Sequence, residues 1–374
     1  MTPKVAQFVA ENSLSTPCLV LDVDRVEQNY RRLTAALPDA RVYYAVKANP
    51  AAPILERLVG LGSAFDAASI EEIDFCLTAG AGPAAISFGN TIKKVSAIQR
   101  AHAAGIQMFA FDSIEELEKL AAHAPGAKVY CRLLVENDGA EWPLSRKFGT
   151  TVEAAKALMI RAAELGLDPY GLSFHVGSQQ TTTGSYETAI GRVGMLFTDL
   201  KRAGIDLRMV NLGGGYPVRY RDEIPGIDRF ADAIMRAMTA AFGNDLPEML
   251  IEPGRFIVGD AGVIRTEVVL ACHKGADPVR WVYLDIGRFG GLAETEGESI
   301  KYRFTTDHDG ETGPVAIAGP TCDGADILYE KSNYRLPLTL TCGDLITIES
   351  TGAYTTTYAS QKFNGFAPLA EHYV

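Results

Sequence analysis

Short apolar runs rich in β-prone residues recur at nearly regular intervals along the first two thirds of the 374-residue chain. They begin at residues 42, 64, 86, 108, 129, 172, 209 and 249, so the first five lie 21 or 22 residues apart. The last three intervals are 43, 37 and 40 residues, which leaves room for a helix plus an elaborated loop. Eight strand–helix alternations favour a (β/α)8 barrel, that is, an α/β TIM barrel, over an open doubly wound sheet.

Helical spacing fills the gaps between these runs. Most of the intervening stretches place apolar residues three and four positions apart, and several close with glycine, as helix C-caps do. Two of them open with SIEE, at Ser69 and Ser113, which has the form of a capping box. We therefore expect helices within residues 51–62, 69–80, 92–105, 113–124, 151–166, 185–204 and 230–243.

The pattern changes near residue 261, where strand-like runs separated by turn residues replace the alternation. These runs cover residues 263–274, 279–287, 302–308, 313–320, 336–350 and 353–360, and an earlier strand-like run covers residues 18–24. The sequence therefore predicts a barrel over residues 24–260, followed by an all-β domain that also takes in the N-terminal strand (residues 1–23 plus 261–374). A loop insertion is expected at residues 136–149.

Charge and composition exclude several classes of function. The net charge is −11 and the pI is near 5.1, which argues against nucleic-acid or anionic-membrane partners and suits a cationic small ligand. No apolar run reaches the ~18 residues that a membrane helix needs, and we expect no secretory signal. The six cysteines and six histidines lack metal-ligand spacing, which predicts reduced thiols, a cytoplasmic location and no metal site.

Polar residues fall at the ends of seven of the eight predicted barrel strands, where a barrel of this kind carries its active site. A polar residue at one strand end is weak evidence, but seven at one opening indicate a site. The residues are Lys47, Asp66, Asn90, Arg132, His175, Gly213, Gly214, Gly215, Glu252, Gly254 and Arg255.

The chemistry of this set points to one cofactor. A lysine in an otherwise apolar run, such as Lys47, is either a strand-end residue that reaches solvent or a Schiff-base amine. Three successive glycines can present backbone N–H groups to a phosphate, and Arg255 could add a charge-assisted bond. A carboxylate such as Glu252 suits a protonated pyridine nitrogen, and His175 could lie flat against the ring. Together these groups indicate pyridoxal 5'-phosphate (PLP).

Eight ordered motifs carry a resemblance to a known family. They are YAVKAN, FDAAS, SFHVGS, NLGGGYP, EPGRF, GPTCDGAD, GAYT and the terminal FNGF, and they span nearly the whole chain from about residue 16 to residue 374. In them the chain resembles the ornithine decarboxylase branch of the alanine-racemase-fold (fold-type III) PLP decarboxylases, in a compact bacterial-type form.

The resemblance implies a role for each residue. Lys47 would hold the cofactor covalently, His175 would stack on its ring, and Glu252 would protonate the ring nitrogen, where a racemase of this fold has an arginine. Asp66 and Arg132 would line the ring and the lysine. The phosphate would be held by Ser178, Gly215, Arg255 and Tyr354, with Gly213, Gly214 and Gly254 in the same cofactor site.

The resemblance also implies a homodimer with shared active sites. Cys322 would reach the partner's site and protonate the substrate carbon after CO2 leaves, and Asp323 would bind the distal amine of the substrate. Lys147 and Asp326 resemble a family pair that bridges the two subunits.

The expected substrate is L-ornithine, giving putrescine, with L-lysine as a second possibility. Glu294 stands in a segment where the family carries a specificity aspartate, so Asp323 and Glu294 are the two carboxylates that could meet the distal ammonium. Three alternatives stay open at this point. A meso-diaminopimelate decarboxylase shares several motifs, a racemase is disfavoured by Glu252, and a non-catalytic paralogue that binds a partner protein is disfavoured because the cofactor residues are present.

Overall fold

The structure is a computed structural model that describes residues 1–135, 138–142 and 147–374. The chain divides into two compact units. The first, called here the barrel unit, comprises Asn29–Pro217 and Ile224–Gly254, and the second, the β unit, comprises Met1–Gln28, Val218–Glu223 and Arg255–Val374. The predicted boundaries at residues 23/24 and 260/261 lie within six residues of this division, and residues 218–223 belong to the β unit.

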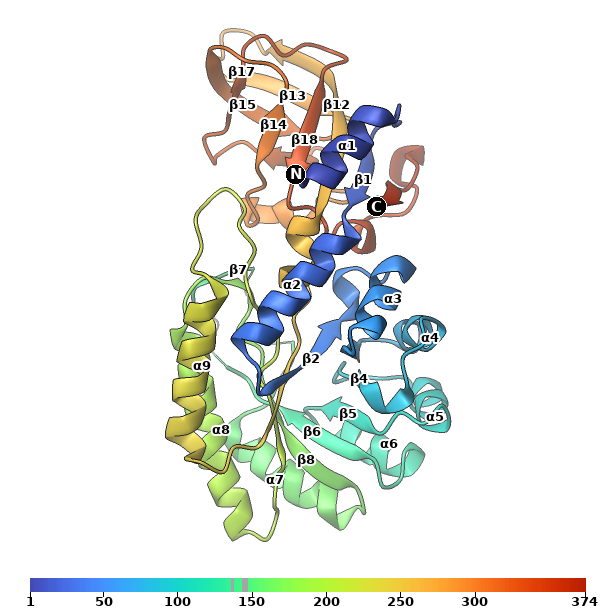
Figure 1. Ribbon diagram of the computed structural model, residues 1–374, viewed down its shortest axis with the longest axis vertical. Coiled ribbons are helices and arrows are strands. Elements are labelled where there is room, and N and C mark those ends of the chain that lie inside the picture. Colours follow the sequence, from blue (N-terminus) through green and yellow to red (C-terminus); the bar gives the residue numbers. More distant parts are fainter. Residues whose placement is uncertain (136–137, 143–146) are drawn as a thin grey trace. The chain divides into compact units, whose positions relative to one another are not determined.

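The barrel unit contains the predicted closed barrel of eight parallel strands (Figure 1). Around the barrel the order is β10-β11-β2-β3-β4-β5-β6-β8, and β8 pairs with β10 to close it. The strands are β2 (Ala40–Ala45), β3 (Ala64–Ala67), β4 (Ile86–Phe88), β5 (Met108–Phe111), β6 (Lys128–Arg132), β8 (Asp168–Ser173), β10 (Met209–Asn211) and β11 (Glu248–Ile251).

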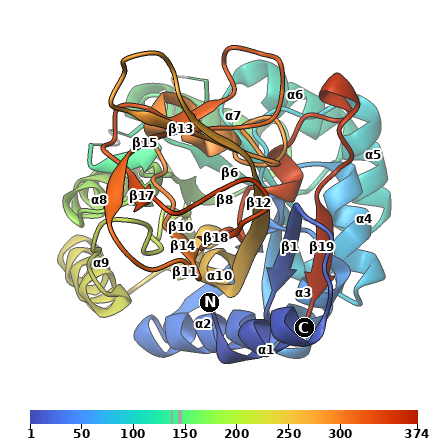
Figure 2. The same ribbon diagram turned by 90° about the horizontal axis from the view of Figure 1, so that it is seen from above.

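Among the described residues, seven helices connect these strands. Figure 2 shows the helices arranged around the barrel. Both SIEE motifs begin helices as predicted, and the hydroxyls of Ser69 and Ser113 accept hydrogen bonds from the third residue of their helices. The glutamates of the two motifs accept from other residues, Glu72 from the N–H of Ala68 and Glu116 from that of Lys93. The helices are α3 (Ala52–Gly60), α4 (Ile70–Thr78), α5 (Val95–Ala103), α6 (Ile114–His123), α7 (Val152–Glu164), α8 (Gly184–Arg202) and α9 (Ile227–Phe242).

Side chains, not solvent, fill the interior of the barrel. They come from six of its strands and form one buried cluster: Tyr43, Ala64, Met108, Ala110, Tyr130, Met209 and Leu250. Packing of this kind makes the barrel a rigid support, so functional side chains are confined to the carboxyl ends of the strands.

The β unit is built on a nine-stranded sheet (Figure 1). Its centre is the long strand β12 (Gly262–His273), which pairs antiparallel with three neighbours. As predicted, the N-terminal strand joins this sheet, and it pairs in parallel with the last strand of the chain. The other strands are β1 (Cys18–Leu21), β13 (Arg280–Leu284), β14 (Phe304–Thr306), β15 (Thr312–Ala318), β16 (Ile327–Tyr329), β17 (Arg335–Pro337), β18 (Leu345–Glu349) and β19 (Ala370–Tyr373).

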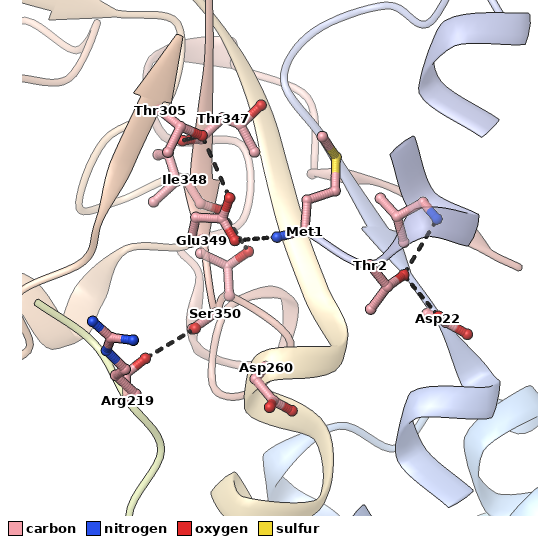
Figure 3. Close-up of polar contacts among 12 residues, drawn as sticks. Met1, Thr2, Asp22, Arg219, Asp260, Thr305, Thr347, Ile348, Glu349 and Ser350 are labelled. Carbon is pink, nitrogen blue, oxygen red and sulfur yellow. Dashed lines mark hydrogen bonds and ion pairs between the residues drawn. The ribbon is translucent and has the colours of Figure 1, made fainter. Parts of the chain in front are cut away.

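Polar contacts join the separate segments of the β unit to one another (Figure 3). Thr2 caps helix α1 (Pro3–Glu11) and donates a hydrogen bond from its hydroxyl to Asp22 at 2.7 Å. The Met1 ammonium pairs with the Glu349 carboxylate at 2.5 Å, and the Ser350 hydroxyl donates to a backbone oxygen of the segment 218–223.

The structure departs from the sequence predictions in three places. Helices α1 and α2 (Val23–Ala36) were not predicted; in α2, charged and other polar residues make up most of the helix and leave few apolar positions to mark its buried side. The strand predicted over residues 353–360 is wrong, since Tyr354 has a φ of +56° and the segment forms a turn and a short 3-10 helix (Thr356–Tyr358). The expected insertion contains strand β7 (Ala140–Trp142), which pairs with β9 (Ser178–Gln180); residues 136–137 and 143–146 lie outside the described residues.

None of the described helices is both long and apolar enough to cross a membrane. The six cysteines form no disulfide bond in this structure.

Candidate active site

Two ionisable side chains, Lys47 and Asp66, lie at the carboxyl ends of the first two barrel strands. Lys47 lies in the single 3-10 turn (Val46–Ala48) that follows β2 and is exposed. Asp66 lies in β3 and is 5% exposed, and its Oδ1 has no hydrogen-bond partner among the described residues. Burial raises the pKa of Asp66 well above its usual value, Glu252 raises it further, and Lys47 opposes the shift. An unpaired buried carboxyl oxygen is costly, so this position is suited to a ligand that supplies a donor.

The carboxylate of Glu252 is held in place at the end of β11. Asn211, at the end of β10, donates from its side-chain amide to Glu252 Oε1 and accepts at Oδ1 from the N–H of Gly213, 2.9 Å away. The N–H of Glu252 donates to the oxygen of Gly213 at 2.8 Å. Sequence reasoning missed Asn211, although its place directly before the three glycines was a usable signal.

The three glycines form a cradle in which side chains have no room. A Cβ on Gly213 would overlap the oxygen of Phe174, and one on Gly214 would lie 2.6 Å from the oxygen of Glu252. Gly215 has a φ of +108°, which side chains rarely allow. The hydroxyl of Tyr186 donates to the backbone oxygen of Gly214 at 2.8 Å and so holds the cradle in place. The sequence analysis missed Tyr186.

His175 follows β8 and is held as a neutral ring. The N–H of Gly177 donates to its Nδ1 at 3.0 Å, so the proton of the neutral imidazole is on Nε2. Burial lowers the pKa of His175 well below its usual value, and the cations of Arg132 and Lys47 lower it further. A Cβ on Gly214 would lie 3.3 Å from Nε2, so the absence of a side chain there leaves this edge of the ring uncovered by residue 214.

The remaining predicted barrel residues lie at the same ends of the strands. Arg132 ends β6, with its guanidinium carbon 5.3 Å from the centre of the Phe148 ring. Asn90 follows β4 and donates to the backbone oxygen of Ala68 at 3.3 Å. Ser178 begins β9.

These observations test whether the barrel unit fits PLP. The cofactor needs a reachable amine, a phosphate cradle that side chains would block, a fixed carboxylate and a flat uncharged ring. Lys47, the glycine cradle, Glu252 and His175 supply these groups, and the orphaned oxygen of Asp66 leaves one acceptor for a ligand. The residues present therefore fit the cofactor.

In the β unit, Arg255 is fully buried in an ion pair. Its Nη1 and Nη2 donate to both oxygens of Glu294, at 2.8 and 2.6 Å, and Nη1 also donates to the hydroxyl of Tyr220 at 2.6 Å. The Tyr354 ring centre lies 4.8 Å from the guanidinium carbon. Glu294, which the sequence analysis assigned to the substrate ammonium, thus has both oxygens on an arginine, with a side chain only 4% exposed.

Cys322 and Asp323 lie on an exposed loop between β15 and β16. Asp323 Oδ1 accepts from the N–H of Ala325 at 2.8 Å, which shapes a tight turn. Asp326, predicted to bridge two subunits, is 2% exposed and accepts hydrogen bonds within its own unit on both carboxylate oxygens. Lys147, its predicted partner, belongs to the barrel unit and is exposed.

Comparisons with known proteins agree with this chemistry. Residues 23–259 match a family model described as the pyridoxal binding domain of pyridoxal-dependent decarboxylases. The lysine/ornithine decarboxylase of Selenomonas ruminantium is 35% identical over 355 residues, which cover 94% of this chain and 88% of that protein. A crystal structure of SrLDC in complex with PLP and cadaverine has a TM-score of 0.89 at 32% identity, covering 100% of this chain and 93% of the other. The arginine decarboxylase of Paramecium bursaria Chlorella virus, bound to agmatine, has a TM-score of 0.91 at 27% identity, covering 100% of both chains.

Proposed function

Because this chain belongs to the fold-type III PLP-dependent decarboxylases of the ornithine/lysine branch, which act on basic amino acids, we propose that it converts L-ornithine to putrescine and CO2. L-Lysine, giving cadaverine, is the second substrate of this proposal. The reaction would place the enzyme in polyamine formation.

Glu252 is the observation that carries the decarboxylase chemistry. A carboxylate beside the pyridine nitrogen keeps a proton there and strengthens the ring as an electron acceptor. When bound, PLP accepts the electron pair that CO2 leaves on the substrate. The hydrogen bond from Asn211 holds the Glu252 carboxyl group at one orientation, so its oxygens are in place before any ligand arrives.

Each of the other residues has a separate task in this proposal. Lys47 would bind the cofactor through its amine, and the neutral ring of His175 would cover one face without adding a positive charge. The glycine cradle would offer backbone N–H groups to the phosphate, together with Ser178, Arg255 and Tyr354.

Two residues of the β unit would act on the substrate. The Cys322 thiol would return a proton to the α-carbon after CO2 leaves, and Asp323 would bind the distal ammonium. A carboxylate on an acidic protein suits a diamino acid, which supports ornithine or lysine over substrates with a second carboxylate.

The test is kcat/KM for L-ornithine, L-lysine, L-arginine and meso-diaminopimelate, measured by CO2 release from the PLP-loaded protein. We expect the highest value for ornithine, with lysine lower by about 10- to 200-fold, because one methylene contributes only ~1–3 kcal/mol to discrimination. Comparable ornithine and lysine values would make the enzyme bifunctional. Activity restricted to arginine or diaminopimelate would contradict the ornithine assignment.

We also propose that the active unit is a homodimer with shared sites, on the resemblance of Cys322; Asp326, whose two carboxylate oxygens are bonded within the β unit, does not support the bridge to Lys147 that the resemblance implies. Lys47→Ala and Cys322→Ala should each be inactive or severely impaired alone. Mixing the two proteins should restore about a quarter of the parent activity, since half of the dimers would then contain one intact site. Absence of any recovery in a mixture shown to exchange subunits would count against shared sites.

A further inference from the structure

The loop that carries Cys322 is anchored at its base by a buried carboxylate. Asp326 accepts hydrogen bonds from the N–H of Arg288 at 2.7 Å and from the N–H and hydroxyl of Thr321 at 3.1 and 2.7 Å. Its own backbone oxygen accepts from the N–H of Gly319 at 2.8 Å. Residues 319–326 are therefore held in one conformation from within the β unit.

A second segment, from the FNGF motif, reaches Cys322 from 42 residues further along the chain. Asn364 lies in the short 3-10 turn Phe363–Gly365 with a φ of +50°, a conformation that asparagine tolerates better than most residues. The preceding ring, Phe363, packs against Phe289 with ring centres 4.8 Å apart. This aromatic contact holds the turn against the β unit.

The side chain of Asn364 makes two contacts with Cys322 through a single oxygen. Asn364 Oδ1 lies 3.0 Å from the backbone nitrogen of Cys322 and 3.3 Å from its Sγ. The backbone N–H can only donate, so the atom it meets must be the amide oxygen and not the amide nitrogen. That oxygen can only accept, so the thiol beside it must present its S–H.

We propose that Asn364 is a positioning residue that holds the S–H of Cys322 in one orientation, ready to deliver its proton. The inference rests on the proposed function, in which Cys322 protonates the substrate. In that step the S–H bond breaks and a C–H bond forms at the α-carbon with the electron pair left by CO2. Sulfur keeps the S–H pair as a thiolate, which then regains a proton from solvent.

The strength of the contact suits this task. A thiol is a weak hydrogen-bond donor, so this contact can orient the S–H and is still easily exchanged for the α-carbon. Loss of the bond should therefore leave the release of CO2 largely intact and degrade the protonation that follows it.

The test compares three variants in the PLP-loaded protein. Asn364→Gly removes the amide and still allows the positive φ, whereas Asn364→Asp keeps an acceptor at the same place. Asn333→Gly is the matched control, because Asn333 is also an exposed asparagine of the β unit with a positive φ (+53°). The thermal unfolding midpoint of each variant checks that it is folded.

The first readout is the rate of alkylation of Cys322 by iodoacetamide, measured by mass spectrometry against the exposed Cys342 of the same chain. We expect the Cys322/Cys342 ratio to rise about fivefold in Asn364→Gly, which is ~1 kcal/mol converted to a rate. The ratio should stay at or below the parent value in Asn364→Asp, and at the parent value in Asn333→Gly.

The second readout is product fidelity, the fraction of CO2-releasing turnovers that end as the amine and not as the aldehyde formed by protonation at the wrong atom. Asn364→Gly should lower this fraction, and Asn333→Gly should not. An unchanged alkylation ratio together with unchanged fidelity in Asn364→Gly would overturn the proposal. The alkylation readout needs no turnover, so it tests the contact between Asn364 and Cys322 even in a protein without activity. A parent protein that released no CO2 would refute the proposed function alone.

Discussion

One buried carboxylate of the barrel unit, Asp66, and two of the β unit, Glu294 and Asp326, differ in how their oxygens are partnered. In the barrel unit, Asp66 is buried with one oxygen that has no hydrogen-bond partner among the described residues. In the β unit, Glu294 and Asp326 are equally buried, but both oxygens of each accept hydrogen bonds. Burial alone therefore does not mark a functional carboxylate. The unsatisfied oxygen marks a position that awaits a ligand, whereas the satisfied ones support the scaffold.

Glu294 gives the largest test of this comparison. Glu294→Ala should lower the free energy of unfolding by about 3–5 kcal/mol, because it leaves the buried guanidinium of Arg255 without its counter-charge. Glu296→Ala, a change at an exposed residue of the same short segment, should stay within about 0.5 kcal/mol. Chemical denaturation measures both. If Glu294 instead served the substrate ammonium, its variant would raise KM for ornithine and leave stability near that of the Glu296 control.

Substitution of Asp66 should change the free energy of unfolding in the opposite direction, that is, stabilise the protein. The pKa of Asp66 is raised in the folded chain, so the folded state binds more protons than the unfolded state above pH 3.8. The stability of the cofactor-free protein should therefore fall as pH rises from there through the folded-state pKa. Asp66→Asn removes this slope, and at neutral pH it should be more stable than the parent by about 1–3 kcal/mol. Equal pH profiles for the two proteins would show that Asp66 carries no penalty.

Lys93 offers the smallest and most local test, because it is a partnered buried charge within the barrel unit. Its ammonium donates to two backbone oxygens and lies 3.0 Å from Glu116, while burial lowers the pKa of Lys93 to about 8. The unfolded state then binds more protons between pH 8 and 10.5, so stability rises with pH in that window. From pH 8 to pH 9 the parent should gain about 1 kcal/mol more than Lys93→Met. Parallel profiles would contradict this difference.

The sequence predicted those parts of the molecule that depend on local pattern. The eight barrel strands and the strand-end residues Lys47 and Glu252 were predictable, because strand-like runs alternate with helical ones along the chain and each polar residue directly follows such a run. Contacts between distant segments were not. Glu294 and Arg255 are 39 residues apart, and Asn364 and Cys322 are 42 apart, so their pairing follows from the packing of the sheet. The turn at residues 353–360 was mistaken for a strand because its side chains are β-prone. The positive φ of Tyr354, which breaks the extended backbone, cannot be read from those side chains.

The buried carboxylate of Asp326 has a consequence for how this protein can evolve. Its two oxygens occupy the space where a Cβ of Gly287 and a Cβ of Gly319 would stand. A Cβ at either glycine would also lie within 2.6 Å of the Cα of the other glycine, so loss of the aspartate alone would not make room for it, and that loss would leave the loop unanchored. The three positions form an epistatic set whose members must be exchanged together, so single-site variation there should be purged even though no member touches the chemistry.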